Sequence, residues 1–269
     1  MSMPNLKFAI SRPSAWCTLL AATFVTGSLQ AADAPAPATA PAAAPAPAVA
    51  VIQPQAMDAL KALGAQLRTL KTFTLHADTT IDEVGDDGQK LQFAGTVDFR
   101  VRRPDHLFAE INSDRRHRTF YYDGKTATQY APRMGYYATF NAPPTIGELL
   151  AVLDDKYGIS FPLTDLFLWG TRDDDGAAIT AAAFVGPSTI AGQECDHFAY
   201  RQADVDWQIW INAKHMPCKL VITTLSEEAQ PQYTSIFTWH PDAKLEDKEF
   251  TFVAPKAAHK IDIAVADAK

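Results

Sequence analysis

Few residues of this 269-residue chain have the types and spacing that a reactive or metal-binding centre requires. The sequence contains no Gly-x-Ser-x-Gly nucleophile elbow, no Walker loop and no paired-glycine dinucleotide motif. The histidines lack the spacing of a zinc site, although a site assembled across separate strands is an alternative that spacing leaves open. We therefore expect no catalytic residue, no metal and no cofactor. The seven histidines are His76, His106, His117, His197, His215, His240 and His259.

A basic cluster at residues 115–118 (Arg-Arg-His-Arg) stands out because the formal net charge of the chain is −7. The negative charge argues against nucleic acid as the main partner. Arginine can bind phosphate through two parallel hydrogen bonds, so the cluster could contact anionic lipid head groups of a membrane or an acidic patch on an envelope protein. An exposed loop without a partner is the simpler interpretation.

Residues 1–31 have the order of a signal peptide: basic residues, then an uncharged stretch at 15–29, then small residues at Ala31 and Ala32. The apolar stretch has about 15 residues, fewer than the roughly 20 that span a bilayer. We therefore expect cleavage after Ala31 or Ala32, with a retained anchor as the alternative. Residues 32–54 are rich in alanine and proline and predict a disordered, semi-rigid linker. The sequence thus predicts export to the periplasm of a Gram-negative cell envelope.

Cys195 and Cys218 are the cysteines outside the predicted leader, and an oxidising compartment favours a disulfide between them. Residues 195–201, 206–212 and 218–224 look like three consecutive strands. In a simple meander the first and third strands lie about 9.5 Å apart, beyond the roughly 7 Å limit between bridged Cα atoms. Because both cysteines lie at a strand end, a bulge or turn could bring them together. We predict the disulfide on this condition.

Hydrophobic periodicity predicts a helix at 54–70, where leucines recur at three- and four-residue spacing. Alternation of apolar and polar residues then predicts strands at 73–81 and 90–103, joined by a Gly-Asp-Asp-Gly turn. Pro104 interrupts this pattern. Four further strands are expected at 106–112, 119–122, 126–130 and 136–140.

The middle of the chain changes to helical patterns. Thr145, with Glu148 three residues later, predicts the N-terminus of a helix that Gly158 ends, and 162–169 predicts a second, short apolar helix. The fold class is therefore α+β: a strongly curved antiparallel sheet of about 11 strands, with the central helices covering its concave face. The strands expected in the last third are 181–185, 195–201, 206–212, 218–224 and 233–239.

Five phrases carry a resemblance to a known family: Thr119–Lys125 (TFYYDGK), Pro144–Leu150 (PTIGELL), Cys195–Arg201 (CDHFAYR), Asp204–Ile211 (DVDWQIWI) and Lys219–Thr223 (KLVIT). The first two resemble the LolA/LolB-like superfamily of periplasmic lipoprotein carriers, and the last three more closely resemble a predicted periplasmic family of unknown function within it. The resemblance covers roughly residues 57–261 of a domain expected at 55–269. It implies an unclosed half-barrel with a helical lid and an apolar cavity, which LolA and LolB use to hold lipoprotein acyl chains.

A half-barrel of this kind implies that inward-facing strand residues and the central helices together line an apolar pocket. We therefore expect a binding or carrier protein, not an enzyme, that holds a lipid, acyl chain or lipidated protein without covalent chemistry. The alternative is an envelope interaction or sensor module whose interior is filled by its own side chains. The predicted lining residues are Phe73, Leu75, Val97, Phe99, Leu107, Ile111, Leu150, Leu153, Leu166, Phe167, Trp169 and Trp207.

Overall fold

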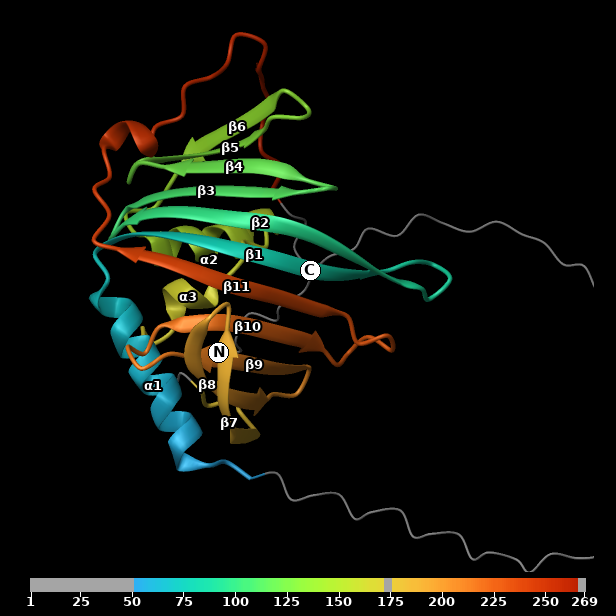
Figure 1. Ribbon diagram of the computed structural model, residues 1–269. Coiled ribbons are helices and arrows are strands. Elements are labelled where there is room, and N and C mark those ends of the chain that lie inside the picture. Colours follow the sequence, from blue (N-terminus) through green and yellow to red (C-terminus); the bar gives the residue numbers. More distant parts are fainter. Residues whose placement is uncertain (1–50, 172–175, 266–269) are drawn as a thin grey trace, which may run out of the picture. The chain divides into compact units, whose positions relative to one another are not determined.

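The computed structural model describes residues 51–171 and 176–265 (Figure 1). The predicted signal peptide and most of the predicted linker lie outside these residues. The boundary expected between linker and domain stays a prediction. Within the described residues, one large sheet and three α-helices carry the architecture.

A single sheet of 12 strands runs in the order β12-β6-β5-β4-β3-β2-β1-β11-β10-β9-β8-β7. All its neighbours pair antiparallel except β12, which pairs parallel with β6. Its outer strands, β7 and β12, do not pair with each other, so the sheet is unclosed and the predicted α+β half-barrel is confirmed. The strands are β1 (Thr72–Val84), β2 (Lys90–Arg102), β3 (His106–Ser113), β4 (His117–Tyr122), β5 (Thr126–Ala131), β6 (Tyr136–Asn141), β7 (Ala181–Ile190), β8 (Gln193–Arg201), β9 (Val205–Ile211), β10 (Pro217–Thr224), β11 (Gln232–Pro241) and β12 (His259–Lys260).

The strands form because apolar and polar residues alternate with the two-residue period of a pleated sheet. In β2, Val97, Phe99 and Val101 are buried, whereas the residues between them are partly exposed. The same alternation in the neighbouring strands gives the sheet one continuous apolar face. We call this concave face, which the helices cover, the inner face, and the opposite one the outer face.

Three helices pack against the inner face: α1 (Pro54–Thr69), α2 (Ile146–Tyr157) and α3 (Asp165–Leu168). The predicted cap of α2 is confirmed, because the Thr145 hydroxyl oxygen accepts a hydrogen bond from the Glu148 amide at 3.3 Å. Gly158 ends α2 in the left-handed conformation, with φ of 62°. The sequence assigned the cover to the two central helices alone, but α1 also buries Leu60, Leu63 and Leu67 in the same core.

The predicted extents of several elements are wrong, among them those of α3 and of the end of the sheet. The second central helix was expected over 162–169 but contains only Asp165–Leu168, since Leu163 adopts a left-handed φ of 56° that a helix cannot continue through. The last strand was expected to end at 239. A further strand, β12, follows it and adds to the outer edge of β6.

The predicted disulfide between Cys195 and Cys218 is confirmed, with a Cα–Cα distance of 6.8 Å. The two cysteines can come this close, although their strands are separated by β9, because both lie where the regular pairing is interrupted or ends. Cys218 lies in a bulge of β10 between Pro217 and Lys219, and Cys195 lies beyond the last residue of β8 that pairs with β9. Both cysteines are buried in a small second cluster on the outer face, which also contains Trp210 and Val221.

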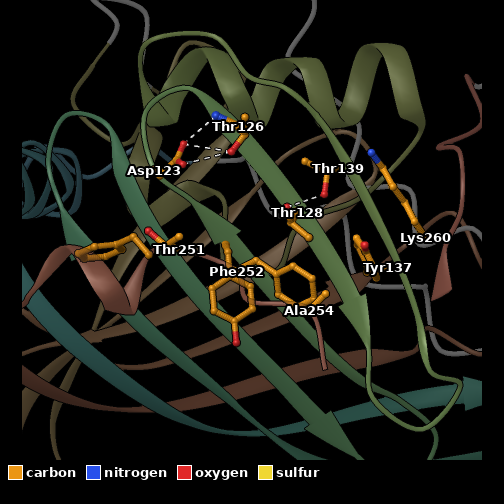
Figure 2. Close-up of a pocket in the computed structure, with 11 residues that line it drawn as sticks. Asp123, Thr126, Thr128, Tyr137, Thr139, Thr251, Phe252, Ala254 and Lys260 are labelled. Carbon is orange, nitrogen blue, oxygen red and sulfur yellow. Dashed lines mark hydrogen bonds between the residues drawn. The ribbon is translucent and has the colours of Figure 1, made fainter. Parts of the chain in front are cut away.

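The chain after β11 crosses the outer face of β4 to β6 (Figure 2). The ring of Phe252 lies 5.0 to 5.5 Å from the rings of Tyr121, Tyr130 and Tyr137. Beside this contact is a polar pocket of about 300 Å³, whose lining includes four threonines. This face of the sheet is therefore partly covered by the chain's own C-terminal segment.

Across the described ranges, every helix is too short or too polar to cross a membrane.

Candidate functional site

All twelve predicted lining residues belong to one apolar core between the inner face and the helices. Ten of them are buried, and Ile111 and Trp169 are partly buried at its margin. Strand and helix residues that are far apart in the sequence are thus brought together, as the half-barrel implied. That they bind a ligand stays a prediction.

Aromatic rings join the helices to the sheet. The ring of Phe99 on β2 lies 5.4 Å from that of Phe167 on α3 in an edge-to-face arrangement and 5.8 Å from that of Phe161. Trp169 and Trp207 stack with their ring centres 5.9 Å apart. Such pairs contribute about 0.5–1.5 kcal/mol each beyond the burial of their area. The position of α3 is therefore set by contacts with aromatic residues of the sheet.

An apolar pocket of about 440 Å³ opens at one end of this core. It lies where the N-terminus of α2, the end of α3 and the turn between β2 and β3 meet. Among the predicted lining residues, Phe167 alone reaches it. Its walls are formed by Lys71, Arg103, Pro104, Thr145, Ile146, Gly147, Phe167, Leu168 and Thr171.

Arg103 is the most unusual residue of this pocket. Its guanidinium carbon lies 5.9 Å from the centre of the Phe167 ring, so the side chain points toward the inner face. Its Nε atom is buried and has no hydrogen-bond partner, and burial lowers the pKa of the guanidinium from its ordinary value. Within the described part of the chain, neither Arg103 nor Lys71 forms an ion pair. The pocket therefore combines apolar walls with two basic side chains that pair with no acidic side chain of residues 51–171 or 176–265.

The N-terminus of α2 forms another part of the pocket wall. The Ile146 amide donates to the Pro104 carbonyl at 2.8 Å, and the Glu148 amide is held by the Thr145 cap. Gly147, between them, is exposed, and a Cβ atom added there would have no heavy atom within 4 Å. A helix N-terminus carries partial positive charge, and the carboxylate of Glu148 in the first turn of α2 lies beside it.

Tyr122 holds the chain segment that leads into α2. Its hydroxyl donates a hydrogen bond to the Pro143 carbonyl at 2.5 Å, and the side chain is fully buried. Burial, together with the negative charges of Asp105 and Glu148, raises the pKa of Tyr122 to about 12. The hydroxyl therefore remains protonated at any physiological pH and keeps donating.

Tyr122→Phe is expected to lower the free energy of unfolding by about 1 kcal/mol, because the Pro143 carbonyl loses its buried donor. The measurement is chemical denaturation together with hydrogen–deuterium exchange. The amides of residues 146–149 should exchange faster in the variant, while those of β9 should not change. Unchanged exchange at the start of α2 would contradict this role for Tyr122.

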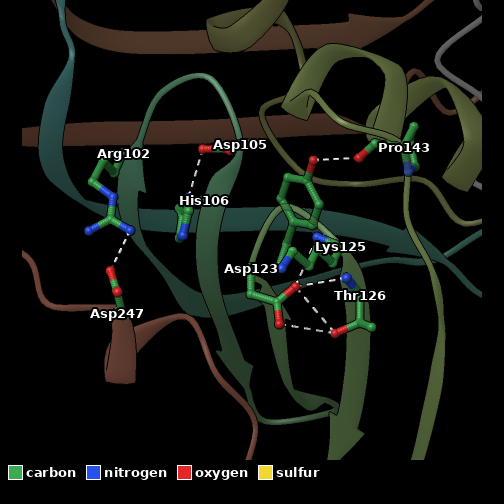
Figure 3. A network of polar contacts seen from close by, with 9 residues as sticks. Arg102, Asp105, His106, Asp123, Lys125, Thr126, Pro143 and Asp247 are labelled. Atoms are coloured by element: carbon green, nitrogen blue, oxygen red, sulfur yellow. Dashed lines mark hydrogen bonds and ion pairs between the residues drawn. The ribbon is translucent and has the colours of Figure 1, made fainter.

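Arg103 and Lys71 were not among the site residues predicted from the sequence. The signal for Arg103 was present, because Val97, Phe99 and Val101 alternate and residue 103 continues the same two-residue period. The adjacent Arg102 points to the outer face, where it donates to Asp247 at 2.6 Å (Figure 3). A charged residue in phase with an apolar face marks a side chain that needs a partner inside.

The basic cluster at 115–118 lies on the hairpin between β3 and β4 and at the start of β4. Arg115 pairs with Glu83 at 3.3 Å. Burial lowers the pKa of Arg118, and the nearby charges of Arg116 and Arg133 lower it further. The exposed-loop interpretation agrees with Arg115 and Arg116, whereas contact with anionic head groups or an acidic partner stays a prediction.

Several histidines lie against carboxylates or an amide, and His76 lies between two carboxylates, those of Asp98 and Asp78. His76 bonds to Asp98 and His117 to Glu110, each at 2.7 Å, and His197 bonds to Gln208 at 2.9 Å. The residues that the structure describes contain no group of three or more histidine, cysteine, aspartate or glutamate side chains that could hold a metal ion. The absence of catalysis and of a cofactor stays a prediction.

Comparison with solved structures finds similar chains of low identity. A chain of the MucA/MucB complex of Pseudomonas aeruginosa is 15% identical, with a TM-score of 0.40, and the match spans 74% of the present chain and 61% of that one. An uncharacterised conserved protein of Thermus thermophilus is 10% identical (TM-score 0.43, 77% and 99% covered). The lipoprotein LppX of Mycobacterium tuberculosis is 12% identical (TM-score 0.42, 72% and 99% covered). The half-barrel fold is therefore assigned from the strand order of the sheet and not from these similarities.

No curated protein matches the chain. A family model described as "Predicted periplasmic protein (DUF2092)" matches residues 56–264, which include every helix and strand except the first two residues of α1. The predicted periplasmic localisation agrees with this description and is confirmed by it. The chain therefore belongs to the DUF2092 family of predicted periplasmic proteins.

Proposed function

We propose that the protein is a periplasmic binding protein that holds an amphiphilic molecule, a lipid or the acyl chain of a lipidated protein, against its apolar inner face. The observation that carries this proposal is the pocket of about 440 Å³ at the end of the core. Pockets for small molecules have roughly 300–1,000 Å³ and mostly apolar walls with a few polar groups. The pocket has this composition, because Ile146, Phe167 and Leu168 lie beside two basic residues.

The acyl chain would extend from this pocket between α3 and the sheet. α3 has only four residues, and rings of the core hold it in place. A helix of one turn can shift at a lower cost than a strand held by a hydrogen-bonded ladder. Each acyl methylene buried by such a shift would contribute about 0.8 kcal/mol.

A second candidate is an envelope interaction or sensor module that binds no small ligand. The observation in its favour is that Phe99, Phe161 and Phe167 occupy the space between the sheet and α3. A carrier must displace these rings, whereas an interaction module needs them in place. The two candidates therefore differ in whether the pocket is ever occupied.

The test uses Gly147→Phe, which places a ring in the pocket from a position where a Cβ atom meets nothing within 4 Å. Gly147→Ala is the matched control, because it adds a Cβ atom but leaves the pocket open. The protein is isolated from the periplasm without detergent and studied by native mass spectrometry with lipid extraction. The wild type and Gly147→Ala should carry an added mass that Gly147→Phe lacks.

A protein that is free of ligand and stays free after incubation with phospholipids and an acylated peptide would overturn the carrier proposal and favour the interaction module. An added mass that persists in Gly147→Phe would show that the ligand binds elsewhere.

A further inference from the structure

We propose that the pocket at the end of the core selects an anionic lipid, with Arg103 and Lys71 binding the phosphate or carboxylate of its head group. This inference rests on the proposed function and names the chemical class of its ligand. It distinguishes a free anionic lipid from the acyl chains of a lipidated protein, which offer no such group beside the chain.

The first argument is the state of Arg103. Its guanidinium packs near the Phe167 ring, its Nε atom is buried without an acceptor, and no described carboxylate pairs with it. A buried charged group without a partner costs free energy. A bound ligand with an anionic group would supply the missing acceptor and offset this cost.

The second argument is the contrast with neighbouring arginines. Arg100 and Arg102 lie on the same strand but point to the outer face, and each has a carboxylate partner, Glu249 at 3.4 Å and Asp247 at 2.6 Å. The chain has 31 acidic residues and 24 arginines and lysines. Arg103 and Lys71 share a pocket whose described lining contains no carboxylate, and their charges give that pocket a positive potential.

The third argument is the order of the groups in the pocket. Lys71 is exposed, Arg103 is partly buried, and Phe167 is buried. The pocket therefore changes from charged to apolar with depth, which matches an anionic head group followed by a hydrocarbon chain.

The experiment compares three probes by isothermal titration calorimetry below their micelle concentrations: decyl phosphate, the uncharged decyl glucoside, and inorganic phosphate. The wild type should bind decyl phosphate about tenfold or more tightly than decyl glucoside, as expected for a hydrogen bond to a charged group. Inorganic phosphate, which lacks a chain to bury, should bind far more weakly than either.

Arg103→Gln should remove the preference for decyl phosphate and leave the affinity for decyl glucoside within about twofold, whereas Arg103→Lys should keep a part of the preference, because lysine retains the charge but not the planar pair of donors. Lys71→Gln should weaken decyl phosphate binding by a smaller factor, because Lys71 is exposed. Lys61→Gln, an exposed lysine of α1 away from the pocket, is the matched control and should bind as the wild type does. Circular dichroism confirms that each variant is folded.

The outcomes separate this inference from the proposed function. Equal affinity of the wild type for decyl phosphate and decyl glucoside, or an unchanged preference in Arg103→Gln, would overturn the head-group assignment while the carrier proposal stands. Inorganic phosphate that binds as tightly as decyl phosphate would replace the lipid by a free anion. If neither amphiphile binds to the wild type, the proposed function fails as well.

Discussion

Phe99→Ala is expected to lower the free energy of unfolding by about 3–5 kcal/mol, the range for removing a buried aromatic ring. Phe99 is 1% exposed and contacts both Phe161 and Phe167. Removal of its ring takes away the burial of that ring, leaves a cavity in the centre of the core, and releases α3 from the sheet. The measurement is urea denaturation followed by tryptophan fluorescence.

The control for this prediction is Phe93→Ala, the same substitution on the same strand. Phe93 is partly exposed and packs against Arg115 near the hairpin end of β2. Its removal should cost about 1 kcal/mol or less, because little surface is lost. An equal loss of unfolding free energy in the two variants would contradict the prediction. It would mean that the buried ring next to α3 stabilises the fold no more than a partly exposed one, and that contacts with Phe99 do not hold α3 to the sheet.

Loss of the disulfide should have the second largest effect. The double variant Cys195→Ala/Cys218→Ala is expected to be about 3 kcal/mol less stable, because the bond constrains a loop with a sequence separation of 23 residues in the unfolded chain. The bond is also buried beside Trp210, whose ring is stacked on His197 with centres 4.0 Å apart. Urea denaturation of the wild type and the double variant, each with and without reductant, measures the effect.

Reductant should bring the wild type to the stability of the double variant and should leave the double variant unchanged. This second comparison separates the disulfide from any packing change caused by the alanines. A wild type whose stability is the same with and without a reductant that fully reduces the bond would contradict the prediction.

The sequence predicted strands and helix ends well where a local pattern, alternation or capping, determines the structure. Val97, Phe99 and Val101 alternate with polar residues, and Thr145 and Gly158 carry the local chemistry of a helix start and a helix end. These signals need no knowledge of tertiary contacts, because they depend on residues at most four positions apart.

Other features could not be read from local patterns. Residues 162–169 are as apolar as a buried helix, but the left-handed Leu163 marks a break, and only half of these residues are helical. β7 extends to Ile190 past Gly186 and Pro187, because a bulge after Phe184 lets the strand continue. β12 has two exposed residues, and its position depends on β6.

The candidate site was predicted in part for the same reason. The predicted lining residues proved to be core residues. A pocket, however, is space that the core side chains do not fill. Its position depends on how α2, α3 and the β2–β3 turn pack together. Arg103 was not predicted as a site residue because a basic residue followed by a proline is typical of the end of a strand. Its inward direction follows only when the two-residue period of β2 is continued past its last apolar residue.

The pairing of β1 with β11 in the middle of the sheet has a consequence for how the chain folds. Phe73 pairs with Pro241 and Ile81 with Tyr233, whereas the other antiparallel pairs join strands that follow one another in the sequence. Synthesis begins at the N-terminus, so one edge of β1 has no partner until nearly the whole chain has been made. Unpaired strand edges aggregate readily, and contacts between distant residues form slowly. The junction of β1 and β11 is therefore the step at which the maturing chain folds most slowly and is most exposed to aggregation.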